Sequence, residues 1–180
     1  MCVVIDANTL SCVFKSSNTS HKDFIPILKW ILFGKAKLSL GGKLFTEEIA
    51  IKQSSFMNFI KELKRFDKIH FFDNSVVDEK MEEVKGNIDD PDFDDPHIIA
   101  LLIVSKATIL CSNDQRLFKF VPQVKKLSNG ALDPKIYTSI GHKPQCGLLC
   151  DENICLCGKH QQLSQNTAEE LLDLIEPRTA

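Results

Sequence analysis

Residues 92–114 read DFDDPHIIALLIVSKATILCSND, and they contain a helix pattern followed directly by a strand pattern. Pro96 suits the first turn of a helix, and the apolar residues after it predict a helix that runs to Ser105. The short apolar run over 107–111 predicts a strand, which ends at the polar residues 112–114. A helix that leads straight into a strand is typical of α/β proteins.

The same alternation extends outward along the chain. Further strands are expected where short apolar runs end at aspartate, glycine or asparagine, namely 3–5, 37–40, 68–72 and an edge strand at 135–137. Helices are expected between them, over about 24–33, from about 43 with apolar residues that recur over 56–63, over 76–84, and at 117–121. Strands that alternate with helices about every 30 residues imply a parallel sheet covered on both faces. We therefore expect a three-layer α/β/α fold with a central parallel sheet of four or five strands.

The composition is that of an ordinary globular domain. The chain has 180 residues, 43% of them hydrophobic and 26% charged, with a net charge of −2, so it is expected to form one packed domain without a general attraction to nucleic acid. It lacks a secretory-signal pattern and an apolar run of membrane-spanning length, which predicts a cytoplasmic protein with no membrane partner. Because the composition changes after Gly141, we expect a core domain over 1–140 and a tail over 141–180.

Acidic residues stand at several strand and helix ends. Asp6 follows the first strand and Asp114 follows the fourth, Asp95 precedes the helix that feeds the fourth strand, and Glu48 lies early in the helix after Gly42. In a parallel sheet these ends meet at one edge, where clustered carboxylates repel one another unless a cation is present. Oxygen-only clusters suit Mg²⁺ or Mn²⁺. The structural alternative is that each carboxylate only caps a helix or a turn.

Three stretches together resemble a PIN domain, the metal-dependent ribonuclease fold that includes the VapC-type toxins. They are VVIDANTL, TEEI and DFDDPHIIALLIVSKATILCSNDQRLF, and the resemblance covers roughly residues 2–140. The pattern matches at Asp6 with Asn8 two positions on, at Glu48 in preference to Glu47, at Asp95 in a D-x-x-I-A form, and at Asp114. Ser112 stands where the family has threonine, which keeps the hydroxyl.

The resemblance implies divalent-metal-dependent hydrolysis of RNA phosphodiester bonds, with cleavage that leaves 5′-phosphate and 3′-hydroxyl ends. It makes Asp6, Asp95 and Asp114 the main Mg²⁺ or Mn²⁺ ligands, with Glu48 holding a metal-bound water or a second metal, and gives Asn8 and Ser112 supporting roles. Asp94 is expected to face solvent. By analogy the biological role is that of a toxin or an antiviral defence effector. Two alternatives stay open, a catalytically inactive PIN-like RNA-binding or scaffold module and a PIN-like deoxyribonuclease.

The charge distribution places a basic stretch directly after the last of these aspartates. Residues 78–95 contain nine acidic and two basic residues, a net of −7, whereas residues 115–143 contain six basic and one acidic residue, a net of +5. Since phosphate contacts supply most nonspecific affinity for nucleic acid, we expect Arg116 and Lys119 to contact an RNA substrate.

The tail holds four of the seven cysteines. Cys146, Cys150, Cys155 and Cys157 are close enough in sequence for a structural Zn²⁺ site, although the spacing also fits an incidental reduced cluster. Because the number of cysteines is odd, no secretory signal is found and three of the cysteines lie in apolar stretches typical of reduced core thiols, we expect no disulfide framework. Thr167 and Glu170 form a capping-box pattern before a short amphipathic helix. That helix would dock on its own domain, on a second copy in a homodimer, or on a protein partner such as an antitoxin.

Overall fold

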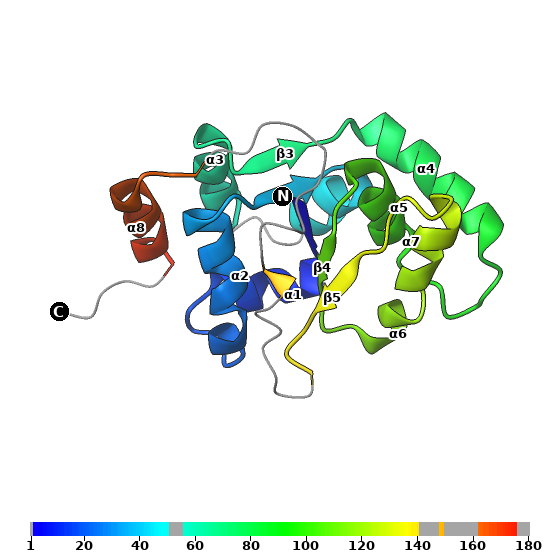
Figure 1. Ribbon diagram of the computed structural model, residues 1–180, viewed down its shortest axis with the longest axis horizontal. Helices are drawn as coiled ribbons and strands as arrows, with labels where there is room; N and C mark the ends of the chain where they lie inside the picture. Colours follow the sequence, from blue (N-terminus) through cyan, green and yellow to red (C-terminus); the bar gives the residue numbers. More distant parts are fainter. Residues whose placement is uncertain (1, 51–55, 141–147, 150–161, 176–180) are drawn as a thin grey trace.

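The fold is a single five-stranded, all-parallel sheet between two layers of helices, as the alternation of strands and helices predicts (Figure 1). The computed structural model describes residues 2–50, 56–140, 148–149 and 162–175. The strands are β1 (Cys2–Ile5), β2 (Lys37–Leu40), β3 (Ile69–Phe71), β4 (Ile109–Cys111) and β5 (Lys135–Tyr137), in the spatial order β3-β2-β1-β4-β5. Strands β1, β2 and β4 are fully buried, and β1 and β4 accordingly consist of short continuous apolar runs.

The helices divide between the two faces of this sheet. The first group is α1 (Ala7–Phe14), α2 (His21–Phe33), α3 (Met57–Arg65) and α8 (Gln165–Asp173); the second is α4 (Asn74–Asn87), α5 (Pro96–Ser105), α6 (Gln115–Phe118) and α7 (Val121–Leu127). The π-helix η1 (Leu44–Ile49) follows β2. Right-handed crossovers explain the division, because the chain first moves outward from β1 to β3 and then returns to β4 on the other side of β1.

This return creates a switch point between β1 and β4. The two strands pair in the register Val3↔Ile109, Val4↔Leu110 and Ile5↔Cys111, and the amide of Asp6 donates to the carbonyl oxygen of Cys111 at 3.0 Å. Both strands therefore end at the same height, so the residues that follow them lie side by side. In open parallel sheets, ligands bind in the crevice at such a switch point.

Two helix ends differ from the sequence-based expectations. The helix expected over 117–121 is two helices, α6 and α7, and Pro122 lies in the first turn of α7, where its missing amide donor costs nothing. The last helix begins at Gln165, and the side chain of Ser164 caps it by accepting from the amide of Thr167 at 3.3 Å. The capping-box assignment to Thr167 was therefore wrong, because the helix starts one turn earlier.

The C-terminal helix α8 packs on its own domain against α2. Ala168 and Leu171 are buried in this contact, and the side-chain amide of Gln162 donates to the carbonyl oxygen of Phe33 at 2.7 Å. Its binding to a second copy or to another protein stays a prediction.

The sequence predicts no disulfide framework, yet one described cysteine is in a disulfide. Cys2 is disulfide-bonded, whereas Cys12 and Cys111 are free thiols. An odd cysteine count leaves at least one thiol without a partner but does not prevent one pair from forming. The predicted zinc ligands Cys146, Cys150, Cys155 and Cys157 lie outside the described residues. In the ranges that the structure describes, no helix is both long and apolar enough to span a membrane.

Candidate metal and phosphate site at the carboxyl edge of the sheet

Asp6 directly follows β1 and is held in place from two sides. As the N-cap of α1 it accepts a hydrogen bond at Oδ1 from the amide of Asn8 at 3.2 Å, and at Oδ2 from the hydroxyl of Ser112 at 2.8 Å. The same Ser112 oxygen accepts from the amide of Asp114 at 3.0 Å. One buried hydroxyl therefore connects the ends of β1 and β4. The side chain of Asn8 itself is on the exposed side of α1.

Asp114 is the N-cap of α6 and accepts a hydrogen bond at Oδ1 from the amide of Arg116 at 2.9 Å. The Arg116 side chain also reaches it, with Nη2 at 3.1 Å from Oδ2. Burial works to raise the pKa of Asp114, but the hydrogen bonds and charge of Arg116 outweigh burial and hold that pKa below its ordinary value.

Asp95 occupies the N-cap position of α5, yet its side chain makes no capping hydrogen bond. Its carboxylate has 27% of its surface exposed and lies 3.9 Å from Nδ1 of His97. Burial raises the pKa of Asp95 to about 6, and the charges of three nearby carboxylates add to this rise, those of Asp94, Asp6 and Asp114. The capping alternative therefore accounts for Asp6 and Asp114, whose side chains do cap helices, but it does not account for Asp95.

The pKa of Asp6 is also raised. Burial is the largest cause, the hydrogen bonds from Ser112 and Asn8 oppose it, and the charges of Asp114 and Glu48 add to the rise. The charge of Asp114 thus acts on Asp6 and on Asp95, and the charge of Asp6 acts on Asp95, although the three residues are far apart in sequence.

Glu48 joins the group from η1. It is partly buried and its charge acts on Asp6, whereas Glu47 is exposed and lies 3.9 Å from Lys43. The turn before η1 depends on Gly42, which has a φ of +55° and whose missing Cβ would lie 2.6 Å from Cγ1 of Val77. The same glycine donates its amide to the side-chain oxygen of Asn74 at 2.8 Å, which ties the start of η1 to α4.

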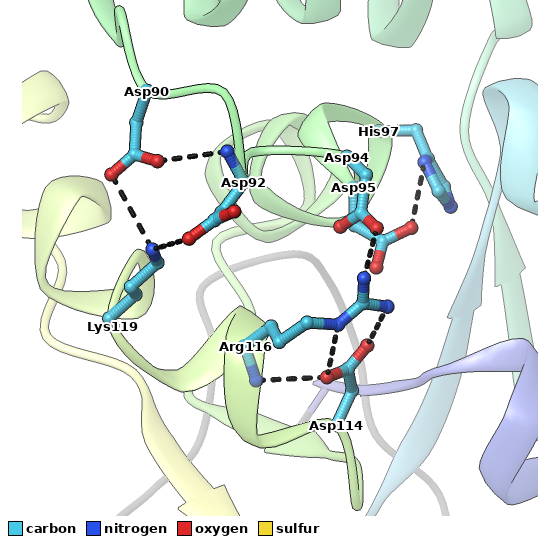
Figure 2. Close-up of polar contacts among 8 residues, drawn as sticks. All are labelled: Asp90, Asp92, Asp94, Asp95, His97, Asp114, Arg116 and Lys119. Atoms are coloured by element: carbon cyan, nitrogen blue, oxygen red, sulfur yellow. Dashed lines mark hydrogen bonds and ion pairs between the residues drawn. The ribbon is translucent and has the colours of Figure 1, made fainter.

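The two expected substrate-binding cations are in ion pairs in this structure. Figure 2 shows the guanidinium of Arg116 between Asp114 and Asp94, with Nη1 at 2.8 Å from Oδ2 of Asp94. Lys119 bridges Asp92 at 2.9 Å and Asp90 at 3.5 Å. Asp94 is half exposed, as expected, but it also has this cationic partner, which sequence reasoning missed.

A second supporting group that sequence reasoning missed is Asn113. Its side-chain oxygen accepts from the hydroxyl of Thr138 at 2.8 Å and from the backbone amide of Ser139 at 3.1 Å, and its backbone amide donates to the hydroxyl of Thr9 at 3.3 Å. These bonds join α1, the end of β4 and the end of β5. The polar triplet at 112–114, directly after a predicted strand, was the available signal in the sequence. The hydrogen-bond partners of Asn113 could not be inferred from it, because they depend on the pairing of β4 with β5.

The donor set fits a hard divalent cation in its chemistry. Asp6, Asp95, Asp114 and Glu48 offer only carboxylate oxygens, and the charges of neighbouring carboxylates add to the rise that burial causes in the pKa values of Asp6 and Asp95. Within the described part of the chain, no three or more His, Cys, Asp or Glu side chains already form a metal-binding group.

No family model, curated protein or solved structure matches the chain. The resemblance to the PIN family therefore stays a prediction.

A separate apolar groove of about 670 Å³ lies between α1, α3 and the residues after α8. Phe14, Phe56, Phe59 and Leu174 line it, and none of the four candidate carboxylates does. The four candidate carboxylates therefore lie outside this groove.

Proposed function

We propose that the protein is a PIN-like, Mg²⁺- or Mn²⁺-dependent endoribonuclease that hydrolyses RNA phosphodiester bonds at the carboxyl edge of its sheet. The observation that carries the proposal is the Asp95 side chain. Asp95 stands at the start of a different helix, yet it lies close enough to Asp6 and Asp114 for their charges to add to the rise in its pKa. Its side chain makes no capping hydrogen bond. A carboxylate that is partly buried among other carboxylates lowers the stability of the fold unless a positive charge compensates it. A bound cation would be the simplest such charge.

Each residue has a distinct part in this proposal. Asp6, Asp95 and Asp114 would hold the cation, with Glu48 at the side of Asp6. A divalent cation bound there polarises the scissile phosphate and favours in-line attack by water. Ser112 orients Asp6 through the 2.8 Å hydrogen bond to Oδ2, and it also fixes the backbone at Asp114.

Arg116 and Lys119 would bind the phosphates on either side of the scissile bond. Both are at least 45% exposed and lie on or directly after the helix that follows Asp114. A flexible cation that is already beside an anionic site can exchange a carboxylate for a phosphate oxygen with little loss of charge pairing. Arg116, with its planar fork of donors, is the better suited of the two for a phosphate.

The direct test is cleavage of end-labelled single-stranded RNA and of DNA with the same sequence, with Mg²⁺, with Mn²⁺ and with EDTA. We expect metal-dependent cleavage of RNA and ends that carry a 5′-phosphate and a 3′-hydroxyl. The matched variant is Asp6→Asn, which removes one charge with little change in volume and keeps an oxygen that can cap α1. It should lower the cleavage rate at least about 100-fold while the circular dichroism spectrum is unchanged.

A catalytically inactive RNA-binding or scaffold module is the second candidate. The observation in its favour is that Arg116 and Lys119 are engaged with carboxylates, while no metal-binding group is preformed within the described residues. This candidate predicts RNA binding without cleavage under every metal condition, and an Asp6→Asn variant that behaves as the wild type. Preferential cleavage of DNA would instead favour a deoxyribonuclease. A role as a toxin or defence effector rests on the resemblance alone.

A further inference from the structure

Arg116 engages both oxygens of Asp114. Its amide and its Nε donate to Oδ1 at 2.9 and 3.4 Å, and Nη2 donates to Oδ2 at 3.1 Å. The remaining guanidinium nitrogen, Nη1, lies 2.8 Å from Oδ2 of Asp94. A single guanidinium therefore forms ion pairs with one candidate metal ligand and with a second carboxylate beside it (Figure 2).

The neighbouring cation Lys119 provides the contrast. Its partners are Asp90 and Asp92, which lie in the loop before α5 and are not candidate ligands. Arg116 and Lys119 are three residues apart, one within α6 and the other directly after it. Only Arg116 makes direct contact with a residue that would bind the cation.

The contacts with Asp114 compete with metal coordination by the same carboxylate. Oδ1 of Asp114 accepts two hydrogen bonds from Arg116, which use both of its lone pairs, whereas Oδ2 accepts one and keeps one lone pair beside the guanidinium. Placing a guanidinium and a divalent cation on one carboxylate also adds repulsion between the two positive charges.

We propose that Arg116 is an internal counter-ion of this site, so that a divalent cation binds only when the guanidinium leaves Asp114. This inference rests on the proposed metal site. Asp94 then holds the displaced side chain nearby, since the 2.8 Å pair to Nη1 need not break when the contacts to Asp114 do. Cation binding thereby turns a guanidinium that neutralises the site into one that faces the substrate phosphate.

The test is calorimetric titration of the full chain with Mn²⁺ alone at low ionic strength. Arg116→Gln removes the guanidinium and should tighten Mn²⁺ binding about fivefold. Arg65→Gln is the control for net charge, since Arg65 is an exposed arginine on α3 that pairs with Glu62. Lys119→Gln is the control for local potential. Both controls should change the Mn²⁺ dissociation constant by less than about twofold.

A second measurement follows the side chain itself. In the wild type, titration with diamagnetic Mg²⁺ should shift the side-chain Nε–Hε resonance of Arg116, which is assigned by its absence in Arg116→Gln, whereas the resonance of Arg65 stays in place. Arg116→Lys keeps the charge but loses the fork, so its Mn²⁺ affinity should lie between those of the wild type and Arg116→Gln.

The outcomes separate this inference from the proposed function. Equal or weaker Mn²⁺ binding by Arg116→Gln, with metal-dependent RNA cleavage intact in the wild type, overturns the inference alone. Tighter Mn²⁺ binding by Arg116→Gln in a chain that cleaves no RNA supports the inference and overturns the nuclease. Absence of Mn²⁺ binding to both proteins overturns the two together.

Discussion

The two edges of the sheet carry buried charges of opposite sign, and these charges differ in the groups that lie next to them. At the amino ends of β2 and β3, the ammonium of Lys37 lies 2.6 Å from Oδ2 of Asp67, and that of Lys68 donates to the carbonyl oxygen of Gly34 at 2.8 Å. At the carboxyl ends, burial raises the pKa of Asp6 and of Asp95, and the charge of Asp114 adds to both rises.

The difference separates charges that bond to groups of the fold from charges that gather at the candidate site. Each lysine bonds to a fixed group of the fold, and Lys68 meets the last turn of α2, where cations are favoured. The carboxylates instead collect beside one another at the switch point, and among the described residues the cation in contact with them is the exposed Arg116. We therefore expect substitutions at the lysine edge to change stability and substitutions at the carboxylate edge to change activity.

The largest effect is expected at the carboxylate edge. Asp95→Asn removes a candidate metal ligand and should lower RNA cleavage by about 100-fold to 1,000-fold. The free energy of unfolding without metal should be unchanged or higher, because a partly buried charge beside other carboxylates is removed. Cleavage assays and urea denaturation of the same preparation check both. Unchanged cleavage would remove Asp95 from the site.

The counterpart at the lysine edge is Lys68→Ala. This change removes a fully buried side chain and leaves the Gly34 carbonyl without its donor, so the free energy of unfolding should fall by about 3 kcal/mol. Urea denaturation measures the loss, and cleavage per folded molecule should match the wild type. A large loss of cleavage with normal stability would contradict the division between the edges.

The lysine edge also predicts a pH dependence. Burial, followed by the charge of Lys37, lowers the pKa of Lys68 to about 8, against the opposing effect of Asp67. Between pH 8 and the ordinary lysine value of 10.5 the unfolded chain binds a proton that the folded chain has released, so stability rises with pH in this window.

Lys68→Met is the reference for this measurement because it cannot titrate. The difference in unfolding free energy, wild type minus Lys68→Met, should increase by about 2 kcal/mol from pH 8 to 10.5. Taking the difference cancels the tyrosine and cysteines that titrate in the same range. A flat difference would mean that Lys68 stays protonated in the folded chain.

The smallest effect is expected for Asp67→Asn. Asp67 has a φ of +55°, which asparagine also tolerates, so the change removes mainly the ion pair with the buried Lys37. The free energy of unfolding should fall by about 0.5 kcal/mol. Asp133→Asn is the control, because Asp133 pairs with the exposed Lys135 and its loss should have no measurable effect. Equal losses in the two variants would show that burial of Lys37 adds nothing to the pair.

The sheet and the approximate positions of its strands could be predicted from the sequence. Short apolar runs that stop at Asp6, Gly41 or Ser112 are strong local signals, and parallel topology then brings the strand ends to one edge. The division of 115–127 into α6 and α7 was missed, because the expected helix was extended through Phe120, where the first helix has already ended.

Most contacts within the candidate site could not be predicted from the sequence. The positions of Asp6 and Asp114 follow from strand ends, whereas the contact of Arg116 with Asp94 depends on where the loop before α5 lies relative to α6. The link from Asn113 to Ser139 depends likewise on the pairing of β4 with β5. Such contacts between distant segments have no signature in the spacing of residues along the chain.

The register of β1 against β4 makes the candidate site sensitive to changes of length. Ile5 lies opposite Cys111, so the next residue of each strand provides one half of the Asp6–Ser112 hydrogen bond. One residue added or lost within β1 would displace Asp6 by about 3.3 Å and reverse the face to which every following side chain of the strand points. A single-codon deletion there would therefore do more harm than most replacements on the surrounding helices.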